Sequence, residues 1–187
     1  MTEADYQAAA DRLGVPIAAV KAVAEVESSG VSFWTINGEQ KPPVRLEAHW
    51  FGKFTAYRFN DSHPQISSKK WTPALAATTH SGAWGQVEVA AGLDKEAAYK
   101  ATSWGAFQIM GMHFDRLGYA SAEDFANSQY TEQGQLDAFI CFIHADPVLL
   151  DSLRRQDWQA FAGRYNGPGQ VDYYAGRMAA AFERHSA

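Results

Sequence analysis

Glu27 stands out because it ends an apolar stripe. At the helical period of 3.6 residues, it lies on the same face as Val20, Val23 and Ala24. A carboxyl group at the edge of a core is desolvated, which favours its protonated form near neutral pH. Such a group can donate a proton in general acid catalysis. The alternative is structural, with Glu27 bridging the end of its helix through a buried hydrogen bond.

A second carboxylate, Glu47, is the candidate partner of this acid. It ends the strand-like segment 44–47, and His49 lies two residues further on. On a strand, residues two apart point to the same face, so we expect Glu47 and His49 to share one. A second carboxylate can activate water or stabilise positive charge. The alternative is a structural interaction of Glu47 with Arg45 or with His49.

The elements that must position Glu27 and Glu47 are short. Thr2 is predicted to cap a first helix that Leu13-Gly14 ends, and a second helix runs from about Pro16 to Ser28. Residues 33–36 and 44–47 are predicted to form strands on either side of the turn Asn37-Gly38 and a longer return loop. Residues 55–86 are predicted to be irregular with one short helix, and residues 55–92 could hold an extra binding subsite.

The second half of the chain is predicted to be helical. The most apolar helix spans 131–144 and should lie at the centre of the core. Cys141 within it is expected to be buried. Further helices are predicted after the capping residues, over 94–101, from 103 to about 110, from about 123, over 157–163 and from about 171 to the end.

Bulk properties limit the classes of function. The chain has 187 residues, which predicts one domain over 1–187. A net charge of −5 without a basic run argues against nucleic-acid binding, and the histidines lack metal-ligand spacing. The acidic start of the chain lacks a signal-peptide pattern. We therefore expect synthesis in the cytoplasm, and export or release by another factor if the protein acts outside it.

Three segments matter as an ordered set. They are Glu27-Ser28-Ser29-Gly30, the block over 103–111 (Ser-Trp-Gly-Ala-Phe-Gln-Ile-Met-Gly), and Arg164-Tyr165-Asn166-Gly167. This set resembles the signatures of the lysozyme-like superfamily, which includes goose-type lysozymes and soluble lytic transglycosylases. With residues 46–51 (Leu-Glu-Ala-His-Trp-Phe) it is most similar to the N-acetylmuramidase domain of bacteriophage endolysins, over nearly the whole chain.

The resemblance implies a mainly α, lysozyme-like α+β fold with a small β-hairpin flanking the catalytic helix. It implies a peptidoglycan hydrolase that cleaves the β-1,4 bond between N-acetylmuramic acid and N-acetylglucosamine, with Glu27 as general acid and Glu47 as second carboxylate. No cofactor or metal is implied. We expect a monomer whose partner is the glycan strand.

The resemblance also suggests which residues hold the glycan. Expected substrate-binding residues are Ser103, Gln108, Tyr165, Asn166, His49 and Trp84. Gln108 offers both a donor and an acceptor to an N-acetyl group or a hydroxyl. Trp34 and Trp104 could also stack on sugars, although core packing is favoured for Trp104 and Trp158.

Three alternatives stay open. A lytic transglycosylase would use the same acid without a second carboxylate and leave a 1,6-anhydro end. A module that only binds the wall would keep the groove and lack activity, and a structural or adaptor role is the third. Contact of the final helix with a membrane, through Arg164, Arg177 and Arg184, is less favoured than an ordinary surface helix.

Overall fold

A computed structural model describes residues 1–187, which divide into two compact units. The first unit combines both ends of the chain, Met1–Ser32 and Glu132–Ala187, and the second is Phe33–Thr131. The prediction of a single catalytic domain stays a prediction. Each unit is described by itself below.

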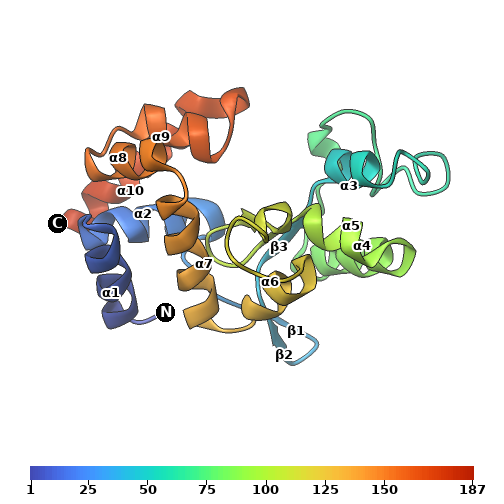
Figure 1. Cartoon of the computed structure of the whole chain (residues 1–187), viewed down its shortest axis with the longest axis horizontal. Helices are drawn as coiled ribbons and strands as arrows, with labels where there is room; N and C mark the ends of the chain where they lie inside the picture. The colour runs from blue at the N-terminus through green and yellow to red at the C-terminus, as the bar shows by residue number, and fades with distance from the viewer. The chain divides into compact units, whose positions relative to one another are not determined.

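The first unit is entirely helical (Figure 1). Its helices are α1 (Glu3–Leu13), α2 (Ile17–Ser28), α7 (Glu132–His144), α8 (Pro147–Arg154), α9 (Trp158–Tyr165), the 3-10 helix η3 (Pro168–Gln170) and α10 (Val171–Ser186). The predicted caps at both ends of α1 are confirmed. Thr2 and Asp5 form a capping box, and Gly14 ends α1 with a φ of 66°. Ser29 ends α2 in the same left-handed conformation.

The core of the first unit lies around α2 and α7. The inner face of α2 consists of alanine and valine, which lets α10 pack closely against it. The predicted stripe of α7 is confirmed, because Leu136, Phe139, Ile140 and Ile143 are all buried. Cys141 was wrongly expected to be buried. It is partly exposed, since at about 100° per residue it lies roughly 150° around α7 from the centre of the buried stripe.

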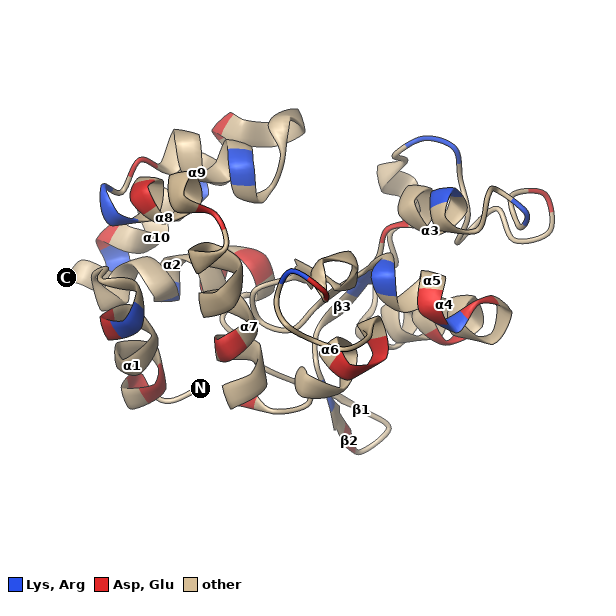
Figure 2. Cartoon of the chain, in the orientation of Figure 1, with Lys and Arg blue, Asp and Glu red and all other residues tan.

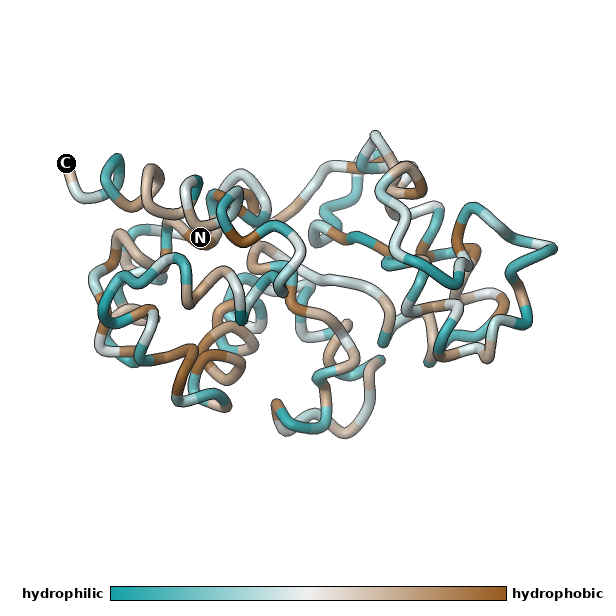
Figure 3. Tube along the Cα trace, turned by 90° about the horizontal axis from the view of Figure 1, so that it is seen from above, coloured by the Kyte–Doolittle hydropathy of each residue, from teal (hydrophilic) through white to brown (hydrophobic).

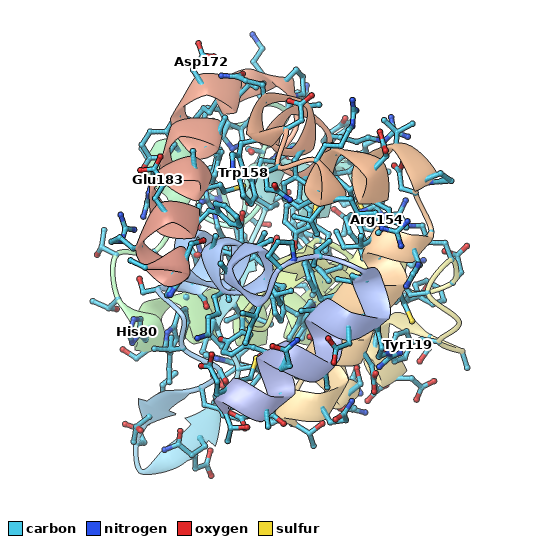
Figure 4. The ribbon with its side chains drawn as sticks, turned by 90° about the vertical axis from the view of Figure 1, so that its left-hand side faces the viewer. His80, Tyr119, Arg154, Trp158, Asp172 and Glu183 are labelled. Carbon is cyan, nitrogen blue, oxygen red and sulfur yellow. The ribbon has the colours of Figure 1, made fainter.

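The final helix, α10, has a buried and an exposed side (Figure 3 traces the alternation of hydropathy along the chain). Ala175, Met178 and Ala181 are buried. Trp158 packs against Phe182 at 5.6 Å between ring centroids, and Figure 4 labels Trp158 together with Asp172 and Glu183 of α10. The buried face thus closes the first unit over α2 and α9.

The second unit mixes short helices with five short strands (Figure 1). The strands are β1 (Trp34–Ile36), β2 (Glu39–Lys41), β3 (Val44–Leu46), β4 (Thr102–Trp104) and β5 (Ile109–Met110). The helices are α3 (Ala48–Phe54), η1 (Pro73–Leu75), α4 (His80–Leu93), α5 (Lys95–Lys100), η2 (Gly111–His113) and α6 (Ala122–Ser128). Asp94 and Ser121 cap α5 and α6, as predicted.

Two strand predictions were wrong in their pairing. The strand at 34–36 pairs with 39–41 because Asn37-Gly38 is a complete two-residue turn, with both residues at positive φ. The strand at 44–46 pairs instead with β4, whose other neighbour is β5. The hairpin is therefore local, and a separate three-stranded antiparallel sheet joins distant parts of the chain.

Two helix predictions also failed. The segment 103–110 forms β4, a turn and β5, because Gly105 and Gln108 have positive φ values that no α-helix accommodates. The helix α4, at 80–93, lies where irregular structure was predicted. Thr79 caps this helix. The helix was not predicted because its glycines at 82, 85 and 92 have a low helix propensity.

The fold is thus mainly helical with small antiparallel sheets, as predicted. Basic and acidic side chains are interspersed along both units (Figure 2). None of the helices is both long and apolar enough to cross a membrane.

Candidate active site

Glu27 lies in the last turn of α2 and is partly exposed. The backbone turns away at once, because Ser29 and Gly30 both adopt left-handed conformations. Asn166 caps the C-terminal end of α9, and its Nδ2 donates a 2.7 Å hydrogen bond to Oε1 of Glu27. Two of the predicted site residues, 139 positions apart, are therefore brought into contact within the first unit.

The amide of Asn166 has one more unusual feature. Its Oδ1 is buried and accepts no hydrogen bond. An unsatisfied buried acceptor costs about 1–3 kcal/mol, so a stable fold retains one only where something compensates. The position beside a carboxylate marks Asn166 as a candidate to accept a hydrogen bond from a ligand.

Tyr165 precedes Asn166 in α9 and is held by aromatic rings. It stacks on Phe161 with 5.1 Å between centroids and meets the edge of Phe142 at 5.4 Å. Part of its surface stays accessible, yet the dense packing disfavours a phenolate. This burial, together with the negative charge of Glu27, raises the pKa of Tyr165 well above its ordinary value. Tyr165 is therefore a neutral hydroxyl rather than a base.

Glu47 belongs to the second unit, where it is the N-cap residue of α3. Its Oε1 lies 3.0 Å from Nε of Arg45, and its Oε2 lies 3.7 Å from Nδ1 of His49. The two contacts weighed as structural alternatives are thus both present. The expectation of a shared strand face was wrong, because the strand ends at Leu46 and His49 lies in α3.

His49 is only partly exposed. Burial lowers the pKa of its imidazole, the charge of Glu47 raises it and that of Arg45 lowers it. The net direction is downward, so the ring is mainly neutral at pH 7. A neutral imidazole offers one donor and one acceptor to a ligand.

Ser103 and Gln108 belong to the β4–β5 hairpin. Ser103 is buried at the centre of the three-stranded sheet, opposite Arg45 and Met110. Gln108 lies in the connecting turn, where its Nε2 donates to the carbonyl of Gly105 at 3.0 Å. The side chain of Gln108 thus supports the turn, and its contact with substrate stays a prediction.

Trp84 is packed inside the second unit. Only 7% of its surface is exposed, and its indole Nε1 donates a 3.0 Å hydrogen bond to the carbonyl of Pro42. Its ring meets Trp104 edge to face at 5.8 Å. Sugar stacking by Trp84 stays a prediction. By contrast, Trp34 lies parallel to His80 at 4.0 Å and is only partly buried.

No sequence motif predicted a site at the segment 71–76. Together with residues 45–49 it lines a small pocket of the second unit. The signal available in the sequence was Trp71, a tryptophan that follows Lys69 and Lys70 and lies two residues before Pro73.

The fold is mainly helical and has small antiparallel sheets. Within it, a carboxylate at the end of a buried helix is held by an amide from another helix. This combination is typical of a lysozyme-like protein. The chain belongs to the N-acetylmuramidase family, whose model matches residues 16–186. It is a glycoside hydrolase that acts on peptidoglycan.

Among solved structures, the chain is similar to the endolysin of the Burkholderia phage AP3. The two share 36% sequence identity and superpose with a TM-score of 0.83. The match covers 100% of this chain and 71% of the endolysin. No curated protein matches the sequence.

Proposed function

We propose that this muramidase hydrolyses the β-1,4 bond between N-acetylmuramic acid and N-acetylglucosamine, with Glu27 as the general acid. One observation carries the proposal, namely the 2.7 Å hydrogen bond from Nδ2 of Asn166 to Oε1 of Glu27. A general acid must hold its carboxyl group in one orientation towards the leaving oxygen. The bond from Asn166 supplies that orientation.

In this mechanism Glu27 donates its proton to the glycosidic oxygen as the bond from the anomeric carbon to that oxygen breaks. The sugar develops oxocarbenium character, and a water molecule adds to the anomeric carbon. Glu47 accepts the proton of that water or stabilises the positive charge. Tyr165 and Asn166 offer a hydroxyl and an amide to the sugar, while Ser103, Gln108, His49 and Trp84 position the glycan.

The test is Glu27→Gln, which preserves shape but removes the proton. We expect the clearing of permeabilised Gram-negative cells to fall by at least about 100-fold, since general acid catalysis contributes roughly 10²–10⁴-fold. Glu25→Gln is the matched control. Glu25 lies two residues away on α2, pairs with Arg184 and His185, and has no part in the reaction. Unchanged clearing by Glu27→Gln would refute the assignment.

A lytic transglycosylase is the second candidate, and one observation favours it. Glu47 is already paired with Arg45 at 3.0 Å and with His49 at 3.7 Å, as a structural carboxylate would be. A transglycosylase needs no second carboxylate, because a hydroxyl of the substrate attacks. Mass spectrometry of the released muropeptides decides between the two. A reducing end supports hydrolysis, and a 1,6-anhydro end supports transglycosylation.

We further propose, from the likeness to a phage endolysin, that the chain is made in the cytoplasm of a bacterial host and acts on the periplasmic wall after release, as a monomer. Size-exclusion chromatography with light scattering tests the monomer. Fractionation of infected cells before and at lysis tests the location.

A further inference from the structure

Two consecutive lysines, Lys69 and Lys70, are exposed near the end of the long loop that follows α3. Most basic side chains of the second unit are paired with a carboxylate, namely those of Lys41, Arg45, Arg58, Lys95 and Lys100. Lys69 and Lys70 have no carboxylate partner within the protein. In a chain with a net charge of −5, two neighbouring unpaired cations are free to bind an anion.

The chain around this lysine pair is basic as well. Residues 50–79 contain Lys53 and Arg58 besides the pair, and their one acidic residue is Asp61. Figure 2 shows the blue positions on α3 and on the loop beyond it. A local excess of positive charge attracts anions from solution, even where the whole protein is acidic.

The backbone of the lysine pair is held in place. The carbonyl of Lys70 accepts a 2.9 Å hydrogen bond from Oγ of Ser68 and a 3.1 Å bond from Oγ1 of Thr72. The backbone N–H of Ser68 donates to the carbonyl of Ala48 at 3.1 Å. Gly52 makes this approach possible, because a Cβ there would lie 2.4 Å from the carbonyl oxygen of Ser68. A loop with a fixed backbone loses less entropy when it binds a ligand.

The same contacts place the lysine pair beside the segment that carries Glu47. Ala48, whose carbonyl binds the N–H of Ser68, directly follows Glu47. On the other side of the pair, Trp71 and Glu47 line the same small pocket. The pair is therefore attached on both sides to the part of the second unit that the proposed mechanism assigns to the substrate.

Peptidoglycan itself supplies a suitable anion. Its N-acetylmuramic acid units carry short stem peptides, which have more free carboxylates than amino groups. An ammonium group binds as a point charge on a flexible stem, so a lysine pair suits carboxylates whose spacing varies.

We propose that Lys69 and Lys70 bind carboxylates of the stem peptides, so that the enzyme prefers strands that carry peptides over bare glycan. The inference rests on the proposed function in that the strand is the substrate. Lys69 and Lys70 are specificity-determining residues, and they take no part in bond cleavage. Their loss should raise KM on peptide-bearing strands and leave kcat unchanged.

The probes are soluble uncrosslinked peptidoglycan strands, used before and after an amidase has removed their peptides. Strand shortening, followed by size-exclusion chromatography, gives kcat and KM for each. Combined Lys69→Gln and Lys70→Gln should lower kcat/KM about 3- to 10-fold on peptide-bearing strands, the range expected for two exposed ion pairs. The value on bare glycan should not change. Combined Lys69→Arg and Lys70→Arg should restore the preference, because the charge returns.

The matched control is Lys95→Gln with Lys100→Gln, which removes the same charge from the same unit. These lysines already pair with Glu123 and Glu96, so this variant should keep the preference of the parent. The preference should also vanish at about 1 M salt, where the Debye length falls to about 3 Å. Since Lys69 and Lys70 are exposed, their variant should melt at the temperature of the parent.

An equal loss on both kinds of strand, or no loss on either, would overturn the proposal. It would also be overturned if the glutamine variant lost binding to phosphatidylglycerol vesicles while keeping the strand preference, because the lysines would then serve a membrane surface. None of these outcomes touches the assignment of Glu27, which stands or falls on wall clearing by Glu27→Gln. The two failures are therefore distinguishable.

Discussion

Nδ2 of Asn166 lies 2.7 Å from Oε1 of Glu27, and the other side of the same amide, Oδ1, is buried without a hydrogen bond. The residue that orients the acid thus also presents an unused acceptor. An amide has one donor end and one acceptor end, so it can hold a carboxyl group and bind a sugar hydroxyl at once. Asn166 is therefore assigned both tasks in the proposed mechanism.

Replacing Asn166 with alanine should lower kcat by about 2- to 10-fold, because the hydrogen bond that orients the protonated acid joins two neutral groups and is worth roughly 0.5–1.5 kcal/mol. Stability should change little, since the buried unsatisfied Oδ1 disappears with the amide. Rates on purified peptidoglycan and a thermal melt measure both effects. Gln159→Ala on the same helix is the control, because Gln159 is exposed and its side-chain amide donates to Asp172, away from Glu27. A rate equal to that of the parent enzyme would contradict the dual role.

Two substitutions of Tyr165 distinguish the packing of its ring from the role of its hydroxyl in the reaction. Tyr165→Phe keeps the ring contacts with Phe161 and Phe142 and removes only the hydroxyl. We expect the melting temperature to fall much less than in Tyr165→Ala, with reduced kcat/KM. Tyr165→Ala should instead cost about 3–5 kcal/mol, as for other large aromatic truncations in a core. Denaturant unfolding of both variants checks this. Full activity in Tyr165→Phe would show that the hydroxyl has no part in the reaction and that Tyr165 is purely structural.

The sequence predicted the helix that carries Glu27, and the helix before it, for a physical reason. The acid lies on a helix whose apolar period is regular, and caps such as Thr2 and Gly14 act through residues a few positions away. Such local relationships can be read from a chain. The Asn166–Glu27 contact spans 139 positions, and a local pattern cannot predict a contact between residues so far apart.

The errors arose where distant parts of the chain compete with local preference. Residues 103–110 have helical composition, but the turn is fixed by Gly105 N–H, which donates to the carbonyl of Pro43 at 2.8 Å, and by strand pairing with residues 44–46. Likewise Glu47 was placed on a strand, whereas the strand ends one residue earlier. Sequence periodicity over three or four residues is too short to decide such cases.

The role of Glu47 can be tested against its ion pair with Arg45. If Glu47 activates water, Glu47→Gln should reduce kcat by about 100-fold or more, as for a lost general base. If it is structural, the same change should leave kcat intact and lower stability by at most about 1 kcal/mol, the usual value of an exposed or half-exposed pair. Arg45→Met is the comparison, since it breaks the pair but keeps the carboxylate.

His113 gives a prediction for the dependence of stability on pH. Burial lowers its pKa from 6.5 to about 4, with Arg116 lowering it further and Asp115 opposing. The unfolded chain therefore binds the proton more readily, so stability is lost as pH falls from about 6.5 towards 4. The loss is up to about 3 kcal/mol, less where water screens the ring. His113→Gln should flatten this part of the curve of melting temperature against pH. A parallel curve would contradict the assignment.

Gly111 lies very close to the backbone of Tyr99. A Cβ at Gly111 would lie 2.1 Å from the carbonyl oxygen of Tyr99 and 3.2 Å from Nε1 of Trp104. Backbone cannot move aside as a flexible side chain can, so Gly111→Ala should destabilise the protein by about 1–3 kcal/mol or more. Gly85→Ala is the matched control, because Gly85 lies inside α4 and a Cβ there meets nothing within 4 Å. That change should stabilise the helix by about 0.5–1 kcal/mol.

Urea unfolding of both variants measures the free energy of unfolding, which should fall in Gly111→Ala and rise in Gly85→Ala. If it rises in both variants, the space at Gly111 does not limit the fold.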